Sequence, residues 1–110
     1  MFGFSLFPKT VTVAEAFEKL GADGHILLDV RTKGEVRDLG IKGAVHIPLD
    51  RLEAELERLG EHASIHVICR SGSRSGVAVQ IMNGAGISQA ANVTGGMIAW
   101  EREGLPTTRG

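Results

Sequence analysis

The chain has 110 residues, of which 43% are hydrophobic and 23% are charged. These values are ordinary for one globular domain and exclude a disordered or fibrous protein. The formal net charge of -1 gives no general attraction to nucleic acid or to an anionic membrane. The apolar segment at residues 1–7 is too short to span a membrane and lacks a basic start, so we expect a soluble, cytoplasmic protein.

Helix and strand patterns alternate along the chain. Thr12 and Glu15 have the spacing of a capping box, and apolar residues follow at helical intervals up to Leu20. Residues 25–30 are mostly apolar on both sides, which is typical of a strand buried inside a parallel sheet. The first part of the chain therefore predicts a helix followed by a central strand.

The alternation continues to the end of the chain. The further predicted elements are a strand at 43–48, an amphipathic helix from Asp50 to Gly60, a strand at 64–69, a helix at 75–83, a strand at 89–93 and a helix at 97–103. Short glycine-rich joints and right-handed crossovers would combine these elements into one α/β domain over residues 1–110. We expect a mostly parallel sheet with helices on both faces.

Cys69 is the only cysteine, so it cannot form an internal disulfide. Neither Cys69 nor the scattered histidines have the spacing of metal ligands, and we expect a free thiol with no metal and no cofactor. A lone cysteine is usually a small hydrophobic residue of the core. A functional role therefore has to be argued from the residues around it.

The segment that starts at Cys69 has the features of an anion-binding loop. Cys69 ends a predicted strand shortly before a helix, and ligands of open α/β sheets bind beyond the carboxyl ends of the strands. Gly72 can adopt positive φ, which lets successive N–H groups converge. The helix N-terminus and two arginines would favour the thiolate, so Cys69 is the candidate nucleophile. The candidate binding residues are Arg70, Ser71, Gly72, Ser73 and Arg74.

The length of this loop bears on the atom that it binds. Four residues separate Cys69 from Arg74, one fewer than in the Cys-x5-Arg loop that cysteine phosphatases wrap around a phosphate. A tighter loop favours a single bound sulfur atom. A persulfide on Cys69 would place its outer sulfur where several N–H groups can donate to it.

Four segments of the chain together resemble the single-domain type of the rhodanese (thiosulfate sulfurtransferase) family. They are residues 28–31 with Glu35, residues 41–48, residues 69–75, and residues 95–100 with 104–106. The resemblance covers roughly residues 10–107 and implies a five-stranded parallel sheet, Cys69 as the persulfide-forming nucleophile, and thiosulfate as a donor. Leu39-Gly40 and Val36 depart from the family's pattern, but both lie outside the loop.

These features predict a sulfurtransferase that moves sulfane sulfur from thiosulfate or a persulfide to a thiophilic acceptor through a Cys69 persulfide. One alternative is a persulfide carrier or regulatory module that a partner protein loads. A weaker alternative is a cysteine phosphatase or arsenate reductase. The expected partners are a small-molecule sulfur donor and a thiophilic acceptor, with a protein in either role as a further option, and no nucleic acid or membrane.

Several polar residues outside the loop have structural interpretations. Asp29 and Arg31 follow a core strand, where a structural ion pair is favoured over a catalytic role. His46 and His66 lie on short apolar strands and are interpreted as hydrogen-bonded structural histidines. Trp100 falls in an apolar helical pattern and is expected in the core.

The two arginines of the loop have different expected roles. The Arg74 side chain has two interpretations: it faces the bound anion, or it turns outward to pair with an acid. Arg70 has no evident structural task and is expected to attract anionic donors at the entrance. Met97 and Ile98 are expected to line the rim of the pocket.

Overall fold

A five-stranded sheet forms the centre of the protein, in a computed structural model that describes residues 9–59 and 62–109. The strands are β1 (Thr10–Val11), β2 (His25–Asp29), β3 (Val45–His46), β4 (Ser64–Ile68) and β5 (Ala90–Val93). Their order in the sheet is β1-β5-β4-β2-β3, and every pairing between them is parallel. This confirms the expected α/β fold. The segment at residues 1–7 lies outside the described residues.

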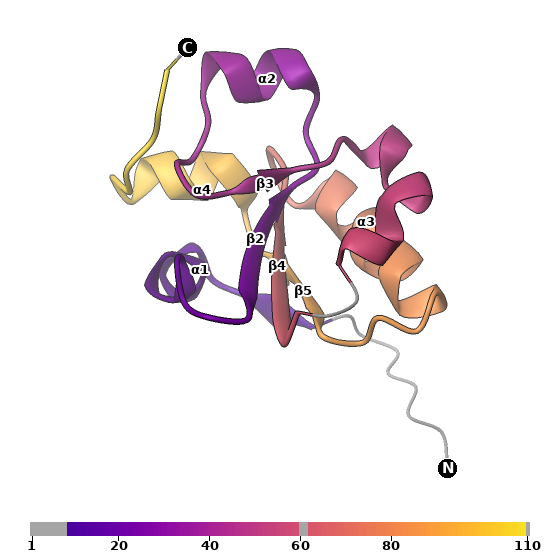
Figure 1. The fold of residues 1–110 in the computed structure, drawn as a ribbon. Coiled ribbons are helices and arrows are strands. Elements are labelled where there is room, and N and C mark those ends of the chain that lie inside the picture. Colours follow the sequence, from indigo (N-terminus) through magenta and orange to yellow (C-terminus); the bar gives the residue numbers. More distant parts are fainter. Residues whose placement is uncertain (1–8, 60–61, 110) are drawn as a thin grey trace.

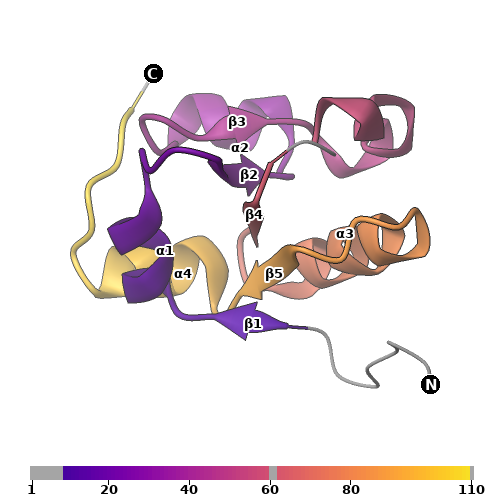
Figure 2. The same cartoon turned by 60° about the horizontal axis from the view of Figure 1, so that its bottom comes forward.

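Helices cover both faces of the sheet. The α-helices are α1 (Val13–Lys19), α2 (Lys33–Asp38), α3 (Ser73–Gly84) and α4 (Gly96–Arg102), and two 3-10 segments are η1 (Leu49–Arg51) and η2 (Glu53–Arg58). In Figures 1 and 2, α1 and α4 lie together on one face, and α3 lies on the other with the segment after β3. Within the described residues, no helix is both long and apolar enough to cross a membrane.

Alternating side chains of β4 divide the interior into two cores. Ile65, Val67 and Cys69 belong to the cluster that contains α3 residues. Ile68 belongs to the other cluster, with Trp100 of α4. Because successive strand residues point to opposite faces, Cys69 faces α3 and the side chain of His66 faces the α1 side. A direct catalytic contact between His66 and Cys69 is therefore excluded.

Residues 50–60 differ from the predicted helix. Two 3-10 segments occupy most of this stretch, and Glu55 interrupts the second with non-helical angles of φ -120° and ψ 16°. Leu49 and Leu52 are three residues apart, a spacing that places both on one side of a 3-10 turn. Leu52 is fully buried, but this stretch forms 3-10 turns and not the predicted continuous helix. Gly60, the expected end of the helix, lies outside the described residues.

Helix α2 was not predicted from the sequence. It has no buried residue, so it carries no apolar period that would reveal it. Its signal is a capping box, in which the Thr32 side chain accepts from the Glu35 N–H and the Glu35 carboxylate accepts from the Thr32 N–H. The Thr12–Glu15 capping box was recognised at α1 and is present in the structure.

His25 and His66 form a contact between β2 and β4. Their ring centroids are 4.3 Å apart, and neither His25 Nε2 nor His66 Nδ1 has a hydrogen-bond partner within the described residues. Burial, reinforced by His25, lowers the pKa of His66 to about 4 from 6.5. The expectation of a hydrogen-bonded imidazole is thus wrong for this nitrogen of His66, whereas His46 Nε2 donates to the carbonyl of Arg31 at 2.7 Å.

We predict that acid weakens the fold through His66. The unfolded chain protonates His66 below pH 6.5, whereas the folded protein resists protonation down to about pH 4. The stability due to neutral His66 is therefore complete above pH 6.5 and is lost progressively as the pH falls toward 4. Between pH 7 and 5 this loss should reach about 1 to 2 kcal/mol in the free energy of unfolding, measured by urea denaturation. The His66→Leu variant should show a shallower pH dependence, and an unchanged slope would contradict this assignment.

Candidate active site

The sulfur of Cys69 lies just beyond the end of β4, in the loop that leads into α3. The residue is only 1% exposed. The Gly72 N–H donates to Sγ at 3.1 Å, and the Ser75 hydroxyl lies 3.2 Å from Sγ. Gly72 has φ 108°, a conformation that favours glycine and turns the loop back toward the sulfur. The loop thus directs donors at one buried atom.

These donors change the acidity of the thiol. Burial by itself raises the pKa of Cys69, but hydrogen bonds from the Ser75 side chain and from backbone N–H groups of the loop outweigh it. The net effect lowers the pKa from its ordinary value. More of the thiol is therefore ionised at neutral pH, which makes Cys69 a better nucleophile.

The Ser75 hydroxyl has one proton and two nearby acceptors. Its oxygen lies 2.6 Å from Asn92 Oδ1 and 3.2 Å from Cys69 Sγ. The amide orientation of Asn92 is set by its other contact, because Nδ2 must donate to the Gly72 carbonyl at 2.9 Å. Asn92 Oδ1 therefore competes with the sulfur for the hydroxyl proton. A neutral thiol can donate its own proton to the Ser75 oxygen. A thiolate accepts the Ser75 proton only when the hydroxyl gives up its hydrogen bond to Asn92 Oδ1.

Backbone N–H groups in the first turn of α4 donate to carbonyl groups at the start of the loop. The Met97 N–H donates to the Cys69 carbonyl at 2.9 Å, and the Ile98 N–H donates to the Arg70 carbonyl at 3.1 Å. Gly96 is buried with φ 54°, and a Cβ atom at this position would overlap both carbonyl groups. The Gly95-Gly96 pair therefore permits a contact that any side chain would prevent.

Arg74 turns to an acid and not inward over the sulfur. Its guanidinium makes a bidentate pair with Glu35, with Nη1–Oε1 and Nη2–Oε2 distances of 2.7 and 2.9 Å. This pair lowers the pKa of Glu35 to about 2. The pair also raises the pKa of Arg74, and the negative charge of Cys69 adds to this rise. Of the two interpretations from the sequence, the structure has the ion pair.

A second ion pair supports the neighbouring strand end. Arg31 Nη2 lies 2.7 Å from Asp29 Oδ2 and donates to the Leu39 carbonyl at 2.7 Å. Both side chains are buried, at 4% and 1% exposed. This arrangement is the structural ion pair expected from the sequence, and it fixes the chain between β2 and α2. Trp100 is fully buried as well, and its Nε1 donates to the Pro106 carbonyl.

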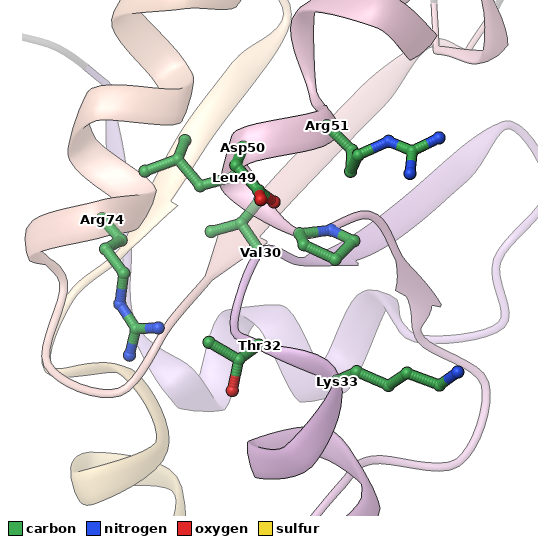
Figure 3. A pocket seen from close by; sticks show the side chains of 8 residues that line it. Val30, Thr32, Lys33, Leu49, Asp50, Arg51 and Arg74 are labelled. Carbon is green, nitrogen blue, oxygen red and sulfur yellow. The ribbon is translucent and has the colours of Figure 1, made fainter.

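Two depressions flank the Arg74–Glu35 pair, one lined by Arg74 and the other by Glu35. We call the larger one, of about 570 Å³, the basic cleft; its lining residues are Val30, Thr32, Lys33, Pro48, Leu49, Asp50, Arg51 and Arg74. We call the smaller one, of about 230 Å³, the acidic pocket; its lining residues are Arg31, Glu35, Asp38, Leu39, Arg70, Met97, Ile98 and Glu101. Figure 3 shows the basic cleft.

The structure places the candidate loop residues in different settings. Gly72 contacts the sulfur directly. Arg70, Ser71 and Ser73 are exposed, and Arg70 lines the acidic pocket with Met97 and Ile98. Ser75 and Asn92 were not among the candidates, although Ser75 contacts the sulfur and Asn92 bonds to both Ser75 and Gly72. Ser75 could have been found from its place at the end of the loop, but Asn92 comes from β5 and no local pattern connects it with Cys69.

Comparison with known proteins gives one consistent family. The model of the Rhodanese-like domain matches residues 12–103. "Thiosulfate sulfurtransferase 16, chloroplastic" of Arabidopsis thaliana is 35% identical over 115 residues, covering 94% of this chain and 95% of that protein. A rhodanese-related protein from Thermoplasma volcanium has a crystal structure that superposes with a TM-score of 0.81 at 28% identity, covering 91% and 97% of the two chains.

A longer relative carries a different name. "Putative sulfur carrier protein YrkF" of Bacillus subtilis is 40% identical over 88 residues, which cover 78% of this chain. The match covers 48% of YrkF, so this chain spans about half the length of that relative.

Replacing Gly96 should disturb the loop as well as the fold. We predict that Gly96→Ala lowers the free energy of unfolding by about 2 kcal/mol or more, because the new Cβ overlaps two carbonyl groups at a positive φ. Cys69 should also be alkylated more slowly. Gly84→Ala is the matched control, because a Cβ there meets nothing within 4 Å. Equal effects of the two substitutions, in urea denaturation and in alkylation, would refute the close contact.

The shared proton of Ser75 predicts coupling between Ser75 and Asn92. Ser75→Ala removes a donor to the thiolate and should raise the pKa of Cys69, which would shift the pH dependence of alkylation to higher pH. Asn92→Ala removes the competing acceptor and should lower this pKa when Ser75 is present. In the Ser75→Ala background the same substitution should have little effect. Equal shifts in both backgrounds would mean that Asn92 acts only through the loop backbone.

Proposed function

The chain belongs to the family of Rhodanese-like domains, and from this premise we propose that it is a sulfurtransferase that carries sulfane sulfur on Cys69. Thiosulfate or a persulfide is the donor in this proposal, and a thiophilic molecule is the acceptor. Sulfur transfer in general is supported by relatives that are named sulfurtransferases. The sulfur is bound covalently to the cysteine, so the proposed reaction needs no separate cofactor.

The observation that carries the proposal is the convergence of hydrogen-bond donors on a buried cysteine sulfur. Gly72 and Ser75 both lie within 3.2 Å of Cys69 Sγ. Their hydrogen bonds lower the pKa of Cys69 and so increase the fraction of thiolate, which is the form that attacks sulfur. The Cys69–Arg74 spacing of four intervening residues supports transfer of sulfur over transfer of phosphate. The reaction needs a free thiol, which the reducing cytoplasm preserves, and we place the reaction there.

The proposed reaction is a double displacement. The Cys69 thiolate attacks the outer sulfur of thiosulfate, the S–S bond of thiosulfate breaks, and sulfite leaves with the electron pair. Cys69 then carries a persulfide. A nucleophilic acceptor attacks the outer sulfur of this persulfide, the Sγ–S bond breaks, and the thiolate returns. With cyanide as the acceptor, the product is thiocyanate, and no external oxidant or reductant is consumed.

The loop residues have distinct roles in this mechanism. The outer sulfur of the persulfide is received by backbone N–H groups of the loop, which include those of the exposed residues Arg70, Ser71 and Ser73. Gly72 and Ser75 stabilise the inner sulfur while it is a thiolate. Arg74 contributes its charge from the side, through its position in the Glu35 pair.

A sulfur-carrier role is the second candidate. It is supported by the name of YrkF, which this chain matches over about half of that protein's length. A carrier would use the same Cys69 persulfide, but a partner protein would load it. The two candidates differ in the rate of loading: thiosulfate loads the enzyme quickly, whereas a carrier is loaded much faster by a protein persulfide.

We predict that thiosulfate adds one sulfur atom to the protein and that cyanide removes it. Intact-mass spectrometry before and after each reagent measures both steps. Cys69→Ser should abolish the adduct, because no thiolate remains to attack, and should leave the circular dichroism spectrum unchanged. Absence of the adduct on the wild-type protein would contradict thiosulfate as the donor, and its persistence on Cys69→Ser would contradict Cys69 as the nucleophile.

A further inference from the structure

The two depressions beside the Arg74–Glu35 pair differ in charge. Apart from that pair, the basic cleft has the cations Lys33 and Arg51 and the single acid Asp50. Apart from the same pair, the acidic pocket has Asp38 and Glu101 against two arginines. In the acidic pocket, Arg31 pairs with buried Asp29, and Asp38 and Glu101 pair with Arg37 and Arg109. Among the described residues, the acidic pocket thus has one cation without an ion pair, Arg70, whereas the basic cleft has two.

The cations of the basic cleft are available for a ligand. Lys33 and Arg51 are exposed, and neither makes an ion pair with another residue in the part of the chain that the structure describes. They come from different elements, α2 and η1. Figure 3 shows both side chains at the end of the cleft away from Arg74. The two cations together make that end of the cleft positive.

Three apolar residues, Val30, Pro48 and Leu49, line the basic cleft together with Thr32 and Asp50. The Leu49 N–H donates to the Val30 carbonyl at 3.0 Å. This bond holds η1 against the end of β2. The volume of about 570 Å³ is within the range of small-molecule sites. The cleft can therefore receive a short hydrocarbon chain.

The other end of the basic cleft leads to the catalytic loop. Arg74 lines the cleft and is the second residue of α3, directly after the loop. Val30 lies in the same apolar cluster as Cys69, and its N–H donates to the carbonyl of Ile68, the residue before Cys69. A molecule that lies along the cleft would thus have one end at the cations and the other beside the Cys69 loop.

We propose that the basic cleft binds the organic part of an acidic thiol or persulfide. Its carboxylate lies between Lys33 and Arg51, its hydrocarbon chain covers Val30, Pro48 and Leu49, and its sulfur reaches Cys69 past Arg74. This inference rests on the proposed sulfurtransferase function and names the class of substrate. The cleft distinguishes acidic thiols from neutral thiols of the same length, which the loop alone cannot do because it binds only the sulfur.

The test compares two acceptors that differ only at the far end of the chain. Cys69 is loaded with sulfur, and the rate of its transfer to 6-mercaptohexanoate is divided by the rate to 6-mercaptohexanol. The charge lies far from the thiol, so both thiols have similar intrinsic reactivity. In Lys33→Gln/Arg51→Gln this ratio should fall by about three- to tenfold, because two partly solvated charge interactions are lost. Added salt should lower the wild-type ratio toward that of the variant.

A matched control changes two cations outside the basic cleft. Arg37 and Arg102 are exposed residues of α2 and α4, and Arg37→Gln/Arg102→Gln alters the net charge by the same amount. This control should keep the wild-type ratio. The proposal is overturned if the Lys33→Gln/Arg51→Gln ratio equals that of the wild type, or if both double variants lower it equally.

A second measurement does not depend on sulfur transfer. Cys69 is alkylated with an iodoacetamide that carries a hexanoate chain, and with the uncharged amide of the same reagent. The charged reagent should lose more of its rate than the neutral one in Lys33→Gln/Arg51→Gln. If thiosulfate fails to load Cys69 while this charge preference is present, the donor is wrong and the cleft is right. If thiosulfate loads Cys69 but the alkylation shows no charge preference, the proposed role of the basic cleft is wrong and the sulfurtransferase proposal stands.

Discussion

In the proposed reaction the buried sulfur of Cys69 must carry negative charge, and the rest of the site depends on this constraint. Burying a charge without partners costs several kcal/mol, so the loop has to supply hydrogen bonds at the point where water is excluded. Gly72 and Ser75 supply them at 3.1 and 3.2 Å from Cys69 Sγ. Their placement requires positive φ at Gly72 and a close approach of α4 at Gly96. The glycines of the loop and of α4 thus permit the arrangement of donors around the sulfur.

The parallel sheet brings the supporting residues together. β4 lies between β5 and β2, so the carboxyl ends of these three strands meet at one edge. Cys69 follows β4, the Asp29–Arg31 pair ends β2, and Asn92 comes from β5. These residues are far apart in the sequence. Their contacts follow from strand order, and the loop is supported from both sides by the strands next to it.

Ion pairing determines which cations remain available to a substrate. Arg31 and Arg74 are occupied by Asp29 and Glu35, which gives them structural work at the edge of the site. Counting arginines in the loop therefore overstates its free positive charge. The available cations of the basic cleft, Lys33 and Arg51, come from other elements. We therefore infer that the loop binds the sulfur, whereas the basic cleft binds the rest of the substrate.

The sequence by itself determined the features that depend on neighbouring residues. The Thr12–Glu15 capping box, the apolar strands and the position of Cys69 between a strand and a helix could all be predicted, because each has a local pattern. α2 has no buried residue, so it left no period to recognise. Only the tertiary structure decided that Arg74 pairs with Glu35, that Asn92 shares the Ser75 proton, and that residues 49–58 form 3-10 turns. The pairings join residues 17 to 39 positions apart, and strand order sets such contacts, whereas local spacing does not.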